Sequence, residues 1–186
     1  MPRVDVLRLA FAAALGVAAP TPTALALDDG ETPTRGEAPV PLPGVRLAEL
    51  WTGLEVRDID GRPWTTADFE GRVVLLDFWA TWCAPCLADF PRIERARAAY
   101  ASRGLVVVSV SLDRCSRRDL RSFGRRQGIT WPVVFDGLGA AGAVARRFQV
   151  DYPPRSLLFD RDGRLIALDL RGATLDAALR VVFSTE

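Results

Sequence analysis

Residues 73–86 read VVLLDFWATWCAPC. Arg72 to Ala80 is a nearly continuous apolar run, which is typical of a central strand covered on both faces. Cys83 and Cys86 follow at once. Pro85 between them suits the first turn of a helix, where a missing N–H costs no hydrogen bond. The stretch therefore predicts a buried strand that leads into a helix with two cysteines at its start.

Outward from this stretch, short apolar segments alternate with turns. Residues 54–59 alternate in polarity and end at Asp60-Gly61, which predicts a hairpin leading to residues 63–65. We expect helices over residues 83–103, 117–127, 140–148 and 174–183, the last with Thr174 as its N-cap, and strands over residues 105–112, 131–135, 155–159 and 164–170. This order predicts an α/β fold with a central mixed sheet flanked by helices and an N-terminal β-hairpin extension.

The two cysteines are the chemically informative pair. Unsatisfied N–H groups and a partial positive charge at the helix N-terminus stabilise a thiolate, so we expect Cys83 to be the attacking, exposed sulfur. Cys86, one turn deeper, is placed to attack the resulting mixed disulfide and release the product. A structural disulfide or half of a zinc site are the alternatives. The chain's three cysteines and lack of histidine count against zinc.

Asp77 interrupts the apolar strand. An unpaired, buried carboxylate costs several kcal/mol when it is charged, so Asp77 is expected to have a raised pKa or a polar partner. We interpret it as the proton acceptor for Cys86. The alternative is a structural Asp that faces solvent or pairs with an arginine.

The composition excludes several classes of function. Every basic residue is arginine, and without lysine or histidine there is no Schiff-base chemistry, no Cys-His activation and no histidine-ligated metal. Without residues 1–26 the acidic and basic residues balance, which gives no reason to expect nucleic acid as a partner. We expect neither a metal nor a cofactor.

The first 26 residues are predicted to be a signal peptide. Arg3 and Arg8 precede or flank an apolar run, and Ala24-Leu25-Ala26 offers small residues for cleavage. An uncleaved membrane anchor is the alternative. Residues 27–44, rich in proline and glycine, are expected to form a flexible linker, and residues 45–186 a single domain. Export leads to a compartment where disulfides persist, periplasmic or otherwise extracytoplasmic.

Residues 74–86 closely resemble the active-site strand and helix of thioredoxins, and above all the exported TlpA/ResA-like branch. Pro91 matches that family's helix proline, and residues 60–63 resemble its N-terminal hairpin. Pro154, followed by residues 160–163, is similar to the family's cis-proline, strand and turn. The resemblance covers about residues 50–183. It implies a thioredoxin fold with Pro154 in cis and facing the cysteine pair.

The resemblance also implies how clients are bound. In this family the residue before the cis-proline offers its backbone N–H and C=O to an extended client segment. Here that residue is Pro153, which has no N–H, so recognition is expected to depend more on side chains, with Trp82, Tyr152 and Arg155 as candidates.

Two other departures concern single residues. Position 77 is Asp, where the exported branch often has Asn. Cys115 has no assignable partner, and we interpret it as a small, half-buried residue, with a regulatory thiol as the alternative.

These observations favour a thiol–disulfide oxidoreductase, and more narrowly a reductase. Ala84-Pro85 between the cysteines offers no polar group to make the disulfide a strong oxidant. The expected partners are disulfide-bearing exported proteins, such as apocytochrome c, and a membrane electron donor. A peroxiredoxin-like peroxidase is one alternative, but Ala80 stands where that site needs a hydroxyl. A redox-inert binding module is the other.

Overall fold

The computed structural model describes residues 44–184. These residues form a five-stranded sheet in the order β5-β4-β3-β6-β7 and a separate two-stranded sheet of β1 and β2. The strands are β1 (Val56–Arg57), β2 (Pro63–Trp64), β3 (Val73–Trp79), β4 (Leu105–Ser111), β5 (Val133–Val134), β6 (Arg155–Phe159) and β7 (Leu165–Leu168). The α-helices are α1 (Leu47–Trp51), α2 (Ala84–Tyr100), α3 (Arg117–Arg126), α4 (Ala143–Arg147) and α5 (Gly172–Ser184). Short 3₁₀ helices cover Thr66–Phe69, Ala101–Arg103 and Gly139–Ala141.

The five-stranded sheet is mixed, as predicted. β3 runs parallel to β4 and antiparallel to β6, while β4 pairs in parallel with β5 and β6 pairs antiparallel with β7. Parallel neighbours need a crossover connection, and α2 supplies it between β3 and β4. β3 therefore lies at the centre of the sheet, with its carboxyl end leading into α2.

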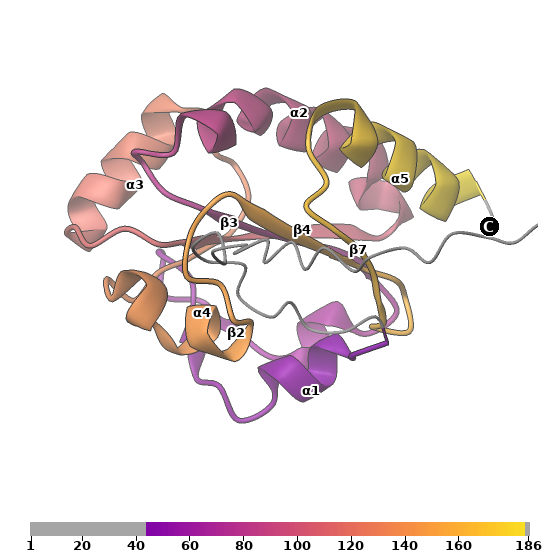
Figure 1. Cartoon of the computed structure of the whole chain (residues 1–186), viewed down its shortest axis with the longest axis horizontal. Coiled ribbons are helices and arrows are strands. Elements are labelled where there is room, and N and C mark those ends of the chain that lie inside the picture. The colour runs from indigo at the N-terminus through magenta and orange to yellow at the C-terminus, as the bar shows by residue number, and fades with distance from the viewer. Residues whose placement is uncertain (1–43, 185–186) are drawn as a thin grey trace, which may run out of the picture. The chain divides into compact units, whose positions relative to one another are not determined.

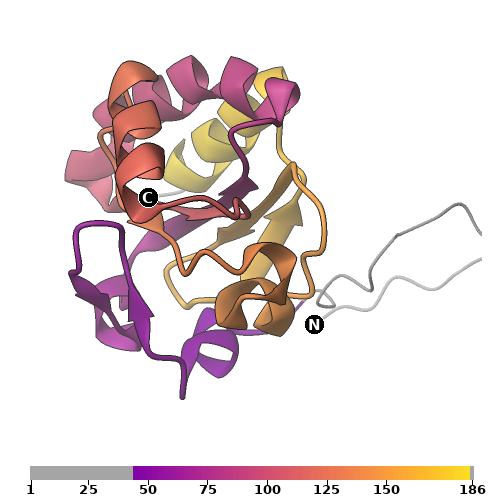
Figure 2. The ribbon, with the colours of Figure 1, turned by 90° about the vertical axis from the view of Figure 1, so that its left-hand side faces the viewer.

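Two apolar layers hold helices against the two faces of this sheet. Every residue of β3 is buried, and alternate residues face opposite layers. Val73, Leu75 and Trp79 pack in the layer under α2, α3 and α5, and Val74, Leu76 and Phe78 pack in the layer under α1, α4 and the hairpin. Figures 1 and 2 show these two groups of helices on opposite sides of the sheet. The predicted central, doubly covered strand is confirmed.

The predicted N-terminal hairpin is formed by β1 and β2. Its turn is held by the buried Asp58, whose carboxylate accepts hydrogen bonds from the backbone N–H groups of Asp60 and Arg62 and from the Trp64 indole. Gly61 occupies the turn with a φ of 91°, a conformation that favours glycine. An isolated bridge from Asp58 to Val134 joins the hairpin to edge strand β5.

The starts of two helices lie two or three residues away from the predicted ones. The helix predicted over residues 140–148 is broken at Gly142, whose backbone is extended, and Asp136 accepts the N–H of Ala143 at the start of α4. The last helix begins at Gly172 rather than after Thr174, because Asp89 of α2 accepts the Gly172 N–H. Both helix starts are capped by carboxylates outside the helix concerned, which local sequence patterns do not reveal.

The predicted signal peptide (1–26) and nearly all of the predicted linker (27–44) lie outside the described residues. Within the described part of the chain, no helix combines the length and the apolarity needed to cross a membrane. Trp51, Trp64 and Trp131 are buried in the apolar layers, as expected for packing residues.

Candidate active site

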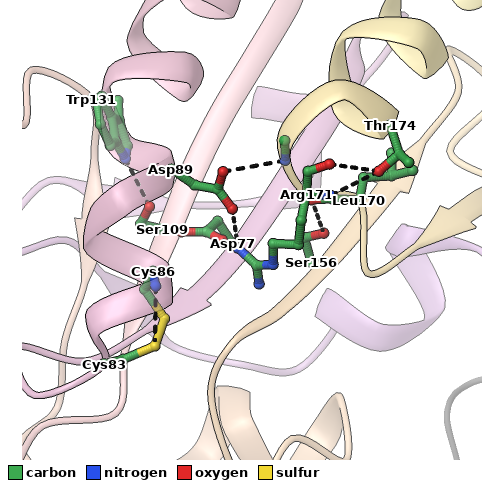
Figure 3. Close-up of polar contacts among 11 residues, drawn as sticks. Asp77, Cys83, Cys86, Asp89, Ser109, Trp131, Ser156, Leu170, Arg171 and Thr174 are labelled. Atoms are coloured by element: carbon green, nitrogen blue, oxygen red, sulfur yellow. Dashed lines mark hydrogen bonds and ion pairs between the residues drawn. A yellow bond between two sulfur atoms is a disulfide. The ribbon is translucent and has the colours of Figure 1, made fainter.

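Cys83 and Cys86 form a disulfide at the N-terminus of α2 (Figure 3). Cys83 is the N-cap of the helix, and Pro85 lies in its first turn. The backbone N–H of Cys86 donates to the Cys83 sulfur over 3.3 Å. When the pair is reduced, the same N–H and the positive end of the helix favour negative charge on Cys83. The local geometry therefore distinguishes the two sulfurs as the sequence predicts.

Exposure does not distinguish them. Cys83 was expected to be exposed, but its exposed fraction is only 4%, against 1% for Cys86. Both sulfurs belong to the apolar layer between the sheet and α2.

The loop between β3 and α2 is fixed by Asp113, a residue that the sequence reasoning missed. Its buried carboxylate accepts hydrogen bonds from the Thr81 backbone N–H over 3.0 and 3.1 Å and from the Thr81 hydroxyl over 2.7 Å. The Ser111 hydroxyl donates to the same carboxylate. Because Thr81 lies two residues before Cys83, these hydrogen bonds to Asp113 fix the backbone that leads to the first cysteine. Its position just after the second buried strand is the one signal that could have pointed to it.

Asp77 lies on β3, on the face that carries Leu75 and Trp79 and therefore on the side of α2. It is buried, and its Oδ1 accepts a hydrogen bond from Nη1 of Arg171 over 3.0 Å. Burial raises the pKa of Asp77 to about 6, although the charge and hydrogen bond of Arg171 lower it. The nearby charge of Asp89 adds a smaller increase to that pKa. Both predicted features, a raised pKa and a polar partner, are present together.

An aromatic contact links the residue before Cys83 to the segment that carries the two prolines. Trp82 and Tyr152 are exposed at 54% and 67%, and their ring centroids are 5.3 Å apart. The peptide bond between Pro153 and Pro154 is cis, which confirms the isomer that the resemblance implied for Pro154. Pro153 is buried and Pro154 is half-buried. Contact with Trp82 therefore brings the loop that ends in the two prolines to the residue before Cys83.

Cys115 is exposed, not half-buried as predicted, and it is a free thiol. Partial burial of its sulfur and the charges of Asp113 and Asp119 raise the pKa of this thiol, which disfavours its reactive thiolate.

Two arginines of α3 bind the hairpin. Arg117 donates to the Asp58 carbonyl over 3.0 Å, and Arg121 forms an ion pair with Asp60. In residues 44–184, no group of three or more metal-ligating side chains lies close enough to hold a metal ion.

Together, the mixed sheet and the Cys-x-x-Cys disulfide at the start of α2 define a protein of the thioredoxin-like fold class. Residues 49–168 match the AhpC/TSA family, and the chain belongs to that family. It has distant homology to the thiol-disulfide oxidoreductase ResA of Bacillus thuringiensis subsp. konkukian, with 29% identity over 111 residues. That match covers 60% of this chain and 62% of the relative, less than two thirds of its length.

Solved structures agree on the fold. The thioredoxin domain of the thiol-disulfide oxidoreductase BVU-2223 from Bacteroides vulgatus superposes with a TM-score of 0.65 and 24% identity, covering 76% of this chain and 99% of that one. A putative thiol:disulfide interchange protein DsbE from Chlorobium tepidum gives a TM-score of 0.61 and 28% identity, covering 74% and 98% of the two chains. The predicted thioredoxin fold is confirmed.

Proposed function

We propose that this protein is a thiol–disulfide oxidoreductase that works by dithiol exchange at Cys83 and Cys86. The observation that carries the proposal is the Cys83–Cys86 disulfide at the N-terminus of α2, with Cys83 as the N-cap. In the reduced protein, the Cys83 thiolate attacks a client disulfide and one client sulfur leaves as a thiolate. Cys86 then attacks Cys83, the client is released as a dithiol, and the protein becomes the disulfide.

Two assays run side by side test this proposal against the alternatives. We expect the protein to accelerate the reduction of insulin by dithiothreitol and to leave hydrogen peroxide unconsumed. Ala80, which is buried, offers no hydroxyl to activate a peroxide, and the hydroxyl of the next residue, Thr81, donates to Asp113. Peroxide consumption without insulin reduction would establish a peroxidase, and the absence of both activities would establish a redox-inert binding module.

We propose further that the protein acts as a reductase outside the cytoplasm. The predicted leader supports export, and the apolar Ala84-Pro85 dipeptide supports a reducing rather than an oxidising pair. The proposed clients are disulfide-bearing exported proteins, apocytochrome c among them, and the proposed source of electrons is a membrane donor.

The reduction potential of the Cys83–Cys86 pair tests the direction of the reaction. Equilibration with glutathione, followed by mass spectrometry of alkylated thiols, measures it. We expect a potential closer to the thioredoxin value of about −270 mV than to the strongly oxidising value of about −120 mV. A value at the oxidising end would contradict the assignment as a reductase.

We propose that clients dock as an extended segment beside Trp82, Pro153 and Pro154. Strand-like pairing with a client needs a backbone donor and an acceptor, and Pro153 can supply only its carbonyl. One missing hydrogen bond weakens docking by about 0.5–1.5 kcal/mol, which is a few-fold to tenfold in affinity. The exposed pair of Trp82 and Tyr152 supplies side-chain contacts in its place.

Pro153→Ile is therefore expected to increase kcat/KM for insulin and for unrelated disulfide peptides by a few-fold, up to about tenfold, because it restores the backbone N–H. Pro153 is buried, so Pro153→Ala serves as a second variant that restores the same N–H without added bulk. Thermal unfolding of both variants monitors the fold. If neither variant reduces these substrates faster than the parent, the missing donor does not limit recognition.

A further inference from the structure

The strongest unexplained feature of the site is the set of charges around Asp77. Arg171 lies at the end of the connection between β7 and α5, 94 residues after Asp77. Its Nη1 is 3.0 Å from Oδ1 of Asp77 and 3.8 Å from Oδ2 of Asp89 on α2. One guanidinium thus faces two carboxylates from two different elements behind the disulfide (Figure 3).

The backbone that carries Arg171 is held in place on both sides. The Ser156 hydroxyl of β6 donates to the Leu170 carbonyl over 3.1 Å, and the Arg171 N–H donates to the Thr174 hydroxyl over 3.0 Å. The Gly172 N–H donates to Asp89 over 3.2 Å. These contacts orient the guanidinium inward, and the Arg171 side chain is only 24% exposed.

The two oxygens of Asp77 are in different environments. Oδ1 accepts from Arg171, whereas Oδ2 is buried and has no partner of hydrogen-bond geometry among the described residues; the nearby Ser109 hydroxyl lowers the pKa of Asp77 only as the last of several causes. A carboxylate held at one oxygen and open at the other can take a proton at the open oxygen. The other groups of β4 and β6 level with Asp77 are the uncharged Ser109 and Ser156. Among residues 44–184, Arg171 and Asp89 are the charged groups that act on Asp77.

We infer that Arg171 is a positioning residue that keeps Asp77 ionised and oriented near neutral pH, so that Asp77 can accept the proton of Cys86. The inference rests on the proposed function. In the step concerned, the proton of Cys86 passes to Asp77 and the Cys86 sulfur attacks the Cys83 sulfur of the mixed disulfide. The Cys83–Cys86 disulfide forms, the bond from Cys83 to the client sulfur breaks, and that sulfur leaves as a thiolate. Without the cation, the buried carboxylate stays protonated to higher pH and cannot accept that proton.

A two-phase reaction with dithiobis(nitrobenzoic acid) isolates this step. The reduced protein releases one thionitrobenzoate when Cys83 attacks the reagent and a second when Cys86 attacks Cys83. Every variant carries Cys115→Ser, since the free Cys115 thiol would add its own signal. The rate of the second phase is recorded from pH 5 to 9 for the parent, Arg171→Met and Arg171→Lys.

In Arg171→Met, we expect the acid limb of the second phase to move upward by at least one pH unit, which slows that phase about tenfold at pH 5, below both limbs, and about twofold at pH 7. In Arg171→Lys the positive charge is kept, so the acid limb should lie close to that of the parent. In an Asp77→Asn background, Arg171→Met is expected to add no further shift, because the acceptor is already absent. Arg92→Met is the matched control, since Arg92 of α2 pairs with Asp176 of α5 and is not among the charged groups that act on Asp77.

An unchanged acid limb in Arg171→Met would overturn the inference, as would equal slowing of both phases or a full shift in the Asp77→Asn background. Thermal unfolding shows whether Arg171→Met is folded. If it is not, Arg171→Lys is the deciding variant, and the acid limb of its second phase must lie near that of the parent. Insulin reduction by the parent tests the proposed function separately. A parent that shows both phases but does not reduce insulin contradicts the proposed function and leaves Arg171 testable.

Discussion

Cys83→Ser is expected to abolish insulin reduction, a loss on the order of a thousandfold or more, because a serine hydroxyl is not ionised at neutral pH and cannot replace the attacking thiolate. Cys86→Ser is expected to lose turnover as well, but in a different way. Cys83 can still attack a client disulfide, and no second thiol is present to release it. The mixed disulfide should therefore accumulate and be visible on a non-reducing gel and by mass spectrometry.

Cys115→Ser is the matched control for both cysteine variants. The thiol of Cys115 is free, and its pKa is raised by partial burial and by the charges of Asp113 and Asp119. Its removal should leave turnover unchanged. If Cys83→Ser traps the client and Cys86→Ser does not, the roles of the two cysteines are reversed. This test is needed because both sulfurs are buried, so exposure does not decide which one attacks.

Asp77→Asn is expected to slow release of the mixed disulfide about a hundredfold near pH 7, since asparagine keeps the size of the side chain but cannot take a proton. The sign of the pH dependence follows from the raised pKa. Burial sets the pKa of Asp77 at about 6, so the parent gains its ionised acceptor as pH rises through 6. The variant lacks that limb, and its release should rise only at higher pH, where Cys86 ionises by itself.

The second phase of the reaction with dithiobis(nitrobenzoic acid), recorded from pH 6 to 9 in a Cys115→Ser background, measures this effect. Asp176→Asn provides the control. Asp176 pairs with Arg92 between α2 and α5 and does not contact Asp77. Circular dichroism monitors the fold of both variants. A second phase that is unchanged across this pH range would assign Asp77 a structural role only.

Much of the fold was predictable from sequence because its signals are local. The apolar run before the cysteines predicted a central strand over residues 72–80, and β3 spans Val73–Trp79 in the structure. The Asp60-Gly61 turn predicted the hairpin, and alternating strands and helices predicted the mixed sheet. Each of these signals depends on residues within a few positions of one another, where backbone preference and burial act together.

The cysteine pair was predictable for the same reason. Helix geometry places residues three apart on neighbouring positions of one face, so spacing alone brings Cys83 and Cys86 together at the start of α2. The special position of Asp77 was also visible, because a carboxylate in an apolar strand needs an explanation. The sequence did not indicate which residue pairs with Asp77.

The hydrogen-bond and ion-pair partners of these residues depend on the tertiary structure. Arg171 meets Asp77 because β6 and β7 return the chain to β3, and Asp113 meets Thr81 because β3 and β4 are parallel and end together. Such contacts join residues far apart in sequence, and any of the chain's 24 arginines could have been the partner of Asp77 as far as local pattern is concerned. Local spacing in the sequence was enough to predict which two sulfurs pair. The way strands pair across the sheet determined which charges surround the carboxylate behind them, because charge pairing depends on spatial neighbours that no local spacing encodes.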